Sequence, residues 1–404
     1  MSEIKVNSIK GVGASTAAIT INNTDGTCNA NITNNLSNRN LVVNGDMRIA
    51  QRSQSSTTLG LVTIDRFATG GTGMDELPTY AQVDVESNVT PYTLGFRKAA
   101  KLTNGNQTSG AGSGDVFKFV TRLEAQSIAT SGWNYKSASS FITLSYWVRS
   151  SVAQTFFVRV TALDSPVYNF PFSYAVSANT WTKVTKTIPG NSNLNFDFNN
   201  NVGLDVEWTL FRGTDTTGSG ATLDTWAAYD SSQRQPDNTS TWYTTNDATW
   251  ELTGVQLEVS DHATDFEHLT FADELRRCQR YFVKTDFTSH CTAYFGGSHL
   301  FRQIQFVCPT PMRAQPSFSV DGQESGGGTK FTIKTWSSDQ NNSTNSAVHL
   351  HHVDYVHGTD NGAIYSVGVG IDFVAGNSGV PPNGPGNHNI YACRLYGATF
   401  SAEI

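Results

Sequence analysis

Short runs of alternating apolar and polar residues dominate the chain from residue 44 to residue 258. Alternation with a period of two places successive side chains on opposite faces of a β-strand. The residues that share a face in this way are Phe117, Phe119, Thr121 and Leu123; Ile142, Leu144, Tyr146 and Val148; Phe156, Val158 and Val160; and Leu204, Val206, Trp208 and Leu210. In the last run Asp205, Glu207 and Thr209 occupy the intervening positions, which predicts one buried and one solvated face.

The strand pattern of residues 250–258 changes phase at Thr253 and Gly254. Its apolar positions are Trp250, Leu252, Val255 and Leu257. An extra residue in one strand shifts the phase in this way, so the sequence predicts a β-bulge.

One segment has a helical period. Its apolar residues recur at i, i+4, i+7 and i+11, as Phe271, Leu275, Cys278 and Phe282. Thr270 stands at the N-cap position and Asp273 three residues later, where an acid is favoured. We expect this connector, within about residues 270–284, to be the only helix longer than two turns.

Beyond the helix, alternating runs return at residues 300–307, 317–320, 331–336, 347–356 and 363–373, separated by turns rich in glycine and asparagine. This pattern predicts a second, smaller β domain. Residues 1–40 are small and polar with one apolar patch at 17–21, and we expect them to need a partner surface.

Composition supports an all-β chain, because only 15% of the 404 residues are charged and Gly, Ser, Thr and Asn crowd between the apolar runs. The net charge of −7 comes without any stripe of Lys or Arg, so neither nucleic acid nor an anionic membrane is an expected partner. No apolar leader or membrane-spanning run is present, which predicts synthesis in a cytoplasm and no membrane insertion. The five cysteines are scattered without a C-x-x-C pair, and we interpret them as buried thiols: Cys28, Cys278, Cys291, Cys308 and Cys393.

Several phrases, taken in order, resemble a known family. They are N-L-V-V-N-G-D-M-R-I-A-Q-R at 40–52, I-D-R-F at 64–67, F-I-T-L-S-Y-W-V-R-S-S at 141–151, W-T-K-V-T-K-T-I-P-G at 181–190, L-T-G-V-Q-L-E-V-S-D-H-A-T-D-F-E-H at 252–268, D-E-L-R-R-C-Q-R-Y-F at 273–282 and P-M-R-A-Q-P-S-F at 311–318. Together they resemble phage tail-fibre and virion structural proteins whose central module is a jelly-roll related to carbohydrate-binding modules. The opening, I-K-V-N-S-I-K-G, resembles the N-terminal arms of fibre proteins from phages of marine bacteria, particularly cyanobacteria.

For this chain the resemblance implies a virion-anchoring arm at 1–40, a jelly-roll β-sandwich at 41–268, a connecting helix at 269–284 and a C-terminal β-sandwich at 285–404 that contacts the host. It also implies a homotrimer on the surface of a phage particle, bound to tail or other particle proteins through residues 1–40 and to host cell-surface polysaccharide further along. A capsid decoration or horn-like protein is the alternative.

Jelly-rolls that bind sugars stack an aromatic ring on the apolar face of a pyranose. The candidates for such contacts are Trp226, Tyr229, Trp242 and Tyr243, in a loop-like stretch, and Tyr355. The alternative is that they cap the sandwich or meet a neighbouring subunit. Trp208 and Trp250 are expected in the core, whereas Trp147 shares its face with Thr143 and Ser145 and is ambiguous.

No cofactor is expected, although two structural metal sites are candidates. Related modules often hold calcium, for which Asp46 is a candidate ligand. His349 and His351 lie at i and i+2, and a threefold axis would bring six such imidazoles together around a transition metal. Clustered histidines on a solvated strand need no metal.

No pair of carboxylates or activated nucleophile is recognisable, so we expect no enzymatic activity. A polysaccharide-degrading tailspike is the remaining alternative, but the coil repeat of a parallel β-helix is absent.

Overall fold

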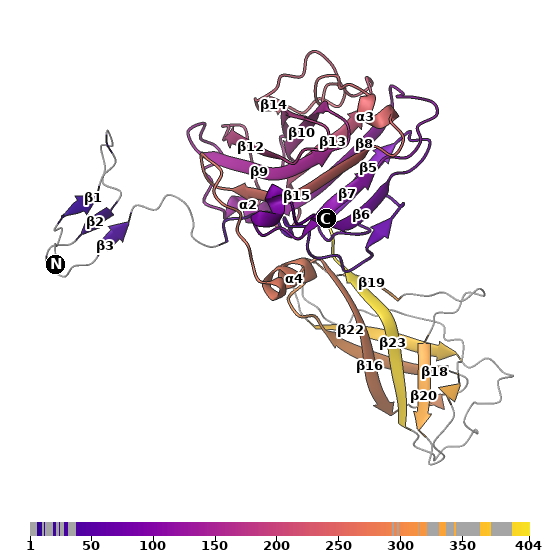
Figure 1. Cartoon of the computed structure of the whole chain (residues 1–404). Coiled ribbons are helices and arrows are strands. Elements are labelled where there is room, and N and C mark those ends of the chain that lie inside the picture. Colours follow the sequence, from indigo (N-terminus) through magenta and orange to yellow (C-terminus); the bar gives the residue numbers. More distant parts are fainter. Residues whose placement is uncertain are drawn as a thin grey trace.

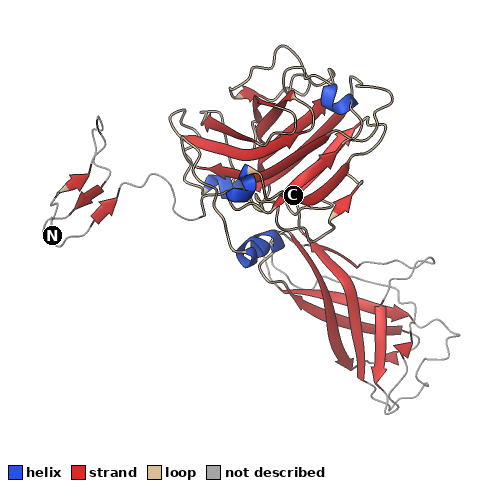
Figure 2. Ribbon diagram, in the orientation of Figure 1, coloured by secondary structure: helices blue, strands red, loops and turns tan. Residues whose placement is uncertain are grey.

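The computed structural model describes residues 38–292 without a gap and, outside them, residues 6–9, 12, 19–21, 24, 28–30, 295–296, 299–314, 316–320, 331–336, 343–344, 364–372 and 390–404. Antiparallel strands are the main regular secondary structure of these residues, and the helices are few and short (Figure 2). The predicted all-β class is therefore confirmed.

Two six-stranded antiparallel sheets form the central sandwich (Figure 1). The first sheet has the order β14 (Ala227–Ala228), β11 (Tyr168–Val176), β10 (Gln154–Ala162), β13 (Val202–Arg212), β8 (Val116–Glu124) and β5 (Phe67–Thr72). The second has the order β12 (Thr182–Pro189), β9 (Phe141–Ser150), β15 (Thr249–Glu258), β7 (Lys98–Thr103), β6 (Thr79–Asp84) and β4 (Ser55–Ser56). Some neighbours are far apart in sequence, such as β8 and β13 or β7 and β15, as in a jelly-roll.

The apolar faces predicted by alternation meet between the sheets. Trp208 and Trp250 are completely buried, and the Trp250 indole N–H donates to the Tyr174 hydroxyl of the other sheet at 3.1 Å. The predicted bulge is also confirmed, because the pairing of β15 with β9 shifts between Thr253 and Gln256.

The other face of the first sheet is not solvated as the sequence predicted. Glu207 and Thr209 are buried because residues 213–240 fold back across β13. The Asn169 side chain of β11 holds this loop by donating to the Arg234 carbonyl at 2.7 Å. The polar positions of β13 therefore do not mark a solvent-exposed face, which is what the sequence predicted.

Three helices of four or five residues accompany the sandwich: α1 (Thr90–Thr93), α2 (Ala125–Ala129) and α3 (Thr241–Thr244). The longer helix, α4 (Phe271–Gln279), lies where the sequence placed it, and the Thr270 hydroxyl accepts from the Asp273 backbone N–H at 3.2 Å. Among the residues described, it alone exceeds two turns. Its buried face differs from the prediction, since Phe271 is exposed while Glu274 is buried and accepts from the Asn44 backbone N–H.

Two further antiparallel sheets follow α4. One contains β16 (Phe282–Thr292), β23 (Ile390–Ser401), β20 (Phe331–Trp336) and β21 (Ser343–Thr344), with β19 (Ser317–Val320) also paired to β23. The other is β17 (Phe295–Gly296), β18 (His299–Val307) and β22 (Ile364–Asp372). The predicted strands at 300–307, 317–320, 331–336 and 363–373 are present, β16 and β23 were missed, and 347–356 lies outside the described residues.

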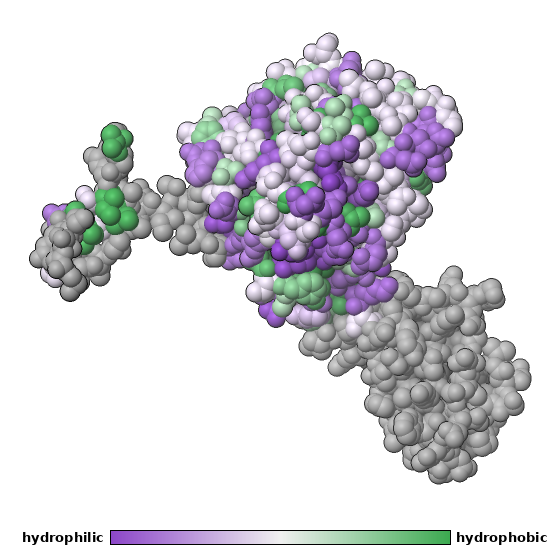
Figure 3. Space-filling model, in the orientation of Figure 1, coloured by the Kyte–Doolittle hydropathy of each residue, from purple (hydrophilic) through white to green (hydrophobic). Residues whose placement is uncertain are grey.

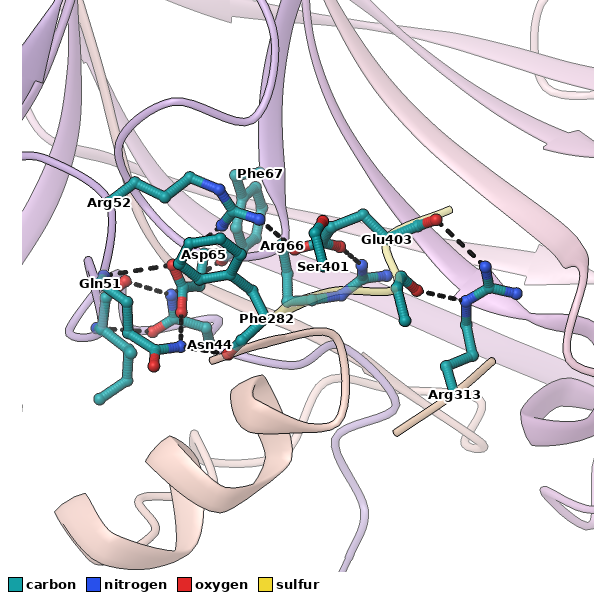
Figure 4. A network of polar contacts seen from close by, with 12 residues as sticks. Asn44, Gln51, Arg52, Asp65, Arg66, Phe67, Phe282, Arg313, Ser401 and Glu403 are labelled. Carbon is teal, nitrogen blue, oxygen red and sulfur yellow. Dashed lines mark hydrogen bonds and ion pairs between the residues drawn. The ribbon is translucent and has the colours of Figure 1, made fainter. Parts of the chain in front are cut away.

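A polar network joins the sandwich to the last residues of the chain (Figure 4). Glu403 accepts from Arg52 at 2.9 Å and also pairs with Arg66. These two guanidinium groups lie over the rings of Phe282 and Tyr281, at 3.6 and 3.5 Å from the ring centroids. Rings and carboxylate together fix both cations at the junction.

Two buried carboxyl groups predict how stability changes with pH. Burial raises the pKa of Asp65, in the junction, and of Asp205, on β13, to about 6 in each case. Because these folded-state values exceed the unfolded one, the stabilisation is complete below the unfolded pKa and is lost as pH rises through about 6. We expect a lower unfolding temperature at pH of about 7.5 than at about 5 in calorimetry, and a smaller difference for Asp65→Asn. A wild-type unfolding temperature that rises over this interval would contradict the prediction.

The described N-terminal residues include a small sheet of β1 (Ser8–Ile9), β2 (Ile19–Ile21) and β3 (Cys28–Ala30). Residues 19–21 of the apolar patch thus pair with strands of their own segment, and the expected partner surface stays a prediction. No described helix is long and apolar enough to cross a membrane.

Candidate functional site

The outer face of the second sheet carries a half-buried tryptophan. Trp147 of β9 lies between Lys183 of β12 and Thr253 of β15 in the pairing register. The alternation that sends Tyr146 and Val148 into the core turns Trp147 outwards, with Ser145 on the same face. The ambiguity noted for Trp147 is resolved in favour of the outer face.

Three aromatic rings from two distant parts of the chain extend this surface. Phe96, Phe266 and His268 pack edge to face or tilted, with centroids 4.9 to 5.1 Å apart. His268 Nε2 lies 2.9 Å from the Leu94 carbonyl oxygen, which can only accept, so Nε2 carries the proton. This contact fixes the orientation of the imidazole ring.

The bulge makes room for these rings. Gly254 has a φ of +64°, and a Cβ atom there would lie 2.7 Å from the Phe96 ring. Glycine therefore serves both the left-handed backbone and the close approach of Phe96.

The resulting hollow, here named the Trp147 groove, has a volume of about 240 Å³. Its lining is Leu94, Phe96, Ser145, Tyr146, Trp147, Lys183, Gly254, Thr264, Asp265, Phe266 and His268. It combines aromatic walls with the aliphatic hydroxyl groups of Ser145 and Thr264, one ammonium group and one carboxylate. Such a site can hold a small ligand that has an apolar face and a hydroxylated rim.

Charged side chains lie beside the groove on the same outer face of the second sheet. Arg149 donates to Glu86 at 2.8 Å and to Glu251 at 2.6 Å, and its guanidinium carbon lies 5.1 Å from the Trp181 ring centroid. Burial opposes ionisation of Glu86, but the hydrogen bonds to this carboxyl and the charge of Arg149 together outweigh it and lower the pKa. The side chains beside the groove are thus held in place by ion pairs.

Most of the aromatic candidates from the sequence lie elsewhere and are buried. Trp242 and Tyr243 are 0% exposed, and Trp226 is 7% exposed. The indole N–H groups of Trp226 and Trp242 donate to the Pro189 and Thr249 carbonyls at 2.7 and 3.0 Å. Their assignment to glycan contact is corrected: the alternative, that they close the sandwich, holds for these three.

Tyr229 is 37% exposed and has the Arg234 guanidinium 5.5 Å from its ring centroid. It remains accessible but lies outside the Trp147 groove. Tyr355 lies outside the described residues.

Asp46, the calcium candidate, has no further carboxylate, imidazole or thiolate ligands within the described part of the chain. Asp46 is buried and forms a 2.9 Å ion pair with Arg48, and burial raises the pKa of its carboxyl. No group of three or more His, Cys, Asp or Glu side chains within the described part of the chain could hold a metal ion. His349 and His351 lie outside that part. Cys278 and Cys308 are buried free thiols, as predicted.

Figure 3 shows polar and apolar residues interspersed over the visible face of the sandwich, without a continuous apolar patch. Sequence reasoning missed Phe96, Phe266 and His268 as site residues. In the sequence, the signal that pointed to this site was the alternation around Trp147, which places it on a face with polar residues.

No family model and no curated protein sequence matches the chain. Its structure is similar to the enzymatically active domain of a tailspike protein of bacteriophage CBA120 (10% identity, TM-score 0.29), over 55% of this chain and 21% of that one. It is also similar to the N-terminal cellulose-binding domain of a β-1,4-glucanase from Cellulomonas fimi (13% identity, TM-score 0.25, 52% and 98% covered). A family 11 carbohydrate-binding module of a Clostridium thermocellum cellulase gives 7% identity and a TM-score of 0.24, with 54% and 98% covered. The chain thus spans about a fifth of the tailspike chain and nearly all of the two binding modules.

Proposed function

We propose that the sandwich binds a glycan in the Trp147 groove. The observation that carries this proposal is a half-buried tryptophan beside hydroxyl and charged side chains, in a hollow on the outer face of a sheet. An indole covers the apolar face of a sugar ring, while Ser145, Thr264 and Asp265 can bind its hydroxyl groups.

The charges in the groove favour an uncharged sugar. Lys183 and Asp265 contribute one charge of each sign to the lining. A net-neutral lining neither attracts nor repels an anionic unit, so specificity rests on hydroxyl geometry and stacking.

Replacing Trp147 tests the proposal. Truncating a central interface aromatic costs about 2 kcal/mol or more, so Trp147→Ala should weaken glycan binding about thirtyfold or more. Binding can be measured by glycan array followed by calorimetry with the best neutral oligosaccharide. Because Trp147 faces outwards, the variant should remain folded, which circular dichroism would check.

Tyr229→Ala is the matched control, because it removes another accessible ring outside the groove. Its affinity should equal that of the wild type. If Tyr229→Ala abolishes binding and Trp147→Ala does not, the groove is not the glycan site.

We further propose that the chain is a trimeric tail-fibre protein on the surface of a phage particle and not an enzyme. The ordered phrases between residues 40 and 318 support this proposal. Antibody-labelled virions in negative stain should show label on tail fibres, and cross-linking should give trimers. Label on the capsid would favour a decoration protein, and release of reducing sugar from host polysaccharide would favour a tailspike.

A further inference from the structure

A second hollow shares no lining residue with the Trp147 groove. It has a volume of about 590 Å³. Segment 38–43, the end of β8 with α2, and α4 with the two residues that follow it surround this hollow. Because these elements lie far apart in sequence, only the folded chain assembles this space.

Three arginines and one glutamate line this arginine pocket, as Arg122, Arg277, Arg280 and Glu124. Arg280 binds Glu124 through two nitrogens, each at 2.8 Å, and the Tyr281 hydroxyl also donates to that carboxylate. Burial alone would raise the pKa of Glu124, but these donors lower it, so the carboxyl stays ionised and neutralises Arg280. The lining keeps two further guanidinium groups, and their carboxylate partners lie outside it: Asp205 is 4.0 Å from Arg122 and Glu274 is 3.8 Å from Arg277.

Arg122 is the least engaged of these cations. Its guanidinium forms one ion pair, at 4.0 Å from Asp205, and its side chain is 42% exposed. Arg277, by contrast, donates to the Asn40 carbonyl at 2.9 Å and so helps hold the wall of the pocket. A planar guanidinium with free donors matches the two oxygens of a carboxylate.

An accessible aromatic ring stands at the same pocket. Phe198 lines it and is 76% exposed, the largest exposure of any Phe, Tyr or Trp side chain within residues 38–285. The amides of Asn38 and Gln126 and the hydroxyl of Ser127 complete the lining with groups that can bind sugar hydroxyls. Ring, amides and guanidinium together suit a pyranose that carries a carboxylate.

We propose that the arginine pocket is a second saccharide site, specific for a carboxylated sugar unit such as a uronic acid. Its carboxylate binds Arg122, and its apolar face lies on Phe198. This site is independent of the Trp147 groove. An experiment can therefore disprove binding at one of the two sites without disproving it at the other.

Galacturonic acid trimers are the probe, and titration of the full chain by NMR or calorimetry is the measurement. We expect binding that weakens as salt is added and is lost when the carboxylates are methyl-esterified. Losing a charge-assisted hydrogen bond should cost about tenfold or more in affinity for Arg122→Gln. Phe198→Ala should also weaken binding, whereas Trp147→Ala should leave it unchanged.

Arg276→Gln is the matched control, because it also removes one arginine charge. Arg276 lies at an exposed position on α4, outside the pocket lining. An equal loss in Arg122→Gln and Arg276→Gln would mean nonspecific attraction and overturn the proposal. Equal binding of the methyl ester, or of acetate at the same concentration, would overturn the assignment to a carboxylated sugar. No binding of the trimer to a folded wild-type chain would overturn it as well.

Discussion

Glu207→Gln is expected to lower the free energy of unfolding by about 3 to 5 kcal/mol, as is typical when one member of a buried ion cluster is removed. Glu207 accepts from Arg159 at 2.8 Å, from Arg212 at 2.7 Å and from Lys118 at 3.1 Å. Glu207, Arg159 and Arg212 are buried beneath the 213–240 loop. The substitution leaves two guanidinium groups in a poorly solvated site without their counter-ion.

Denaturant unfolding followed by tryptophan fluorescence measures this loss. Glu86→Gln is the control, since Glu86 also pairs with an arginine but is exposed, and exposed pairs contribute about 1 kcal/mol or less. Arg159→Met should cost less than Glu207→Gln, because Glu207 keeps Arg212 and Lys118. A larger loss for Arg159→Met would show that Glu207 is not the centre of the cluster.

Glu403→Gln is expected to loosen the junction between the sandwich and the C-terminal sheets. The Glu403 carboxylate pairs with both Arg52 and Arg66, and the Arg66 side chain is only 3% exposed. Removing the negative charge leaves a buried cation, for which a cost of about 3 to 5 kcal/mol is typical. The two parts should then unfold in separate calorimetric transitions, and limited proteolysis should cut near α4.

Ser317→Ala provides the comparison, because it removes one exposed hydrogen bond to Ser401 in the same region. It should keep the wild-type unfolding profile. A single transition at the wild-type temperature for Glu403→Gln would mean that the rings of Tyr281 and Phe282 hold the arginines without the carboxylate.

Most of the correct predictions from the sequence rest on the alternation of apolar and polar residues and on the point where that alternation changes phase. The face made by Leu204, Val206 and Trp208 is buried as expected, because a period of two follows directly from strand geometry. The bulge at Gly254 was visible for the same reason. Strands β16 and β23 were missed, since their stretches mix small and polar residues and their pairing with each other spans more than a hundred residues.

The candidate site was harder to predict, because burial of a loop residue depends on where the loop folds. Trp242 and Tyr243 stand in a polar stretch, yet α3 turns both rings inwards. Trp147 could be suspected from its polar face. Its partner Phe266 could not, because the sequence does not show that residues after β15 return to the outer face of the sheet.

The ends of the C-terminal sheets meet at one place. Phe282, where β16 leaves α4, pairs with Ser401 near the end of β23, and the Ala402 backbone N–H donates to the Tyr281 carbonyl at 2.8 Å. The start of the first C-terminal strand and the end of the last one are therefore adjacent, so these sheets join the sandwich at one place. We therefore expect that another β domain could replace this one without altering the sandwich, provided that the incoming segment keeps Tyr281, Phe282 and Glu403, which contact Arg52 and Arg66.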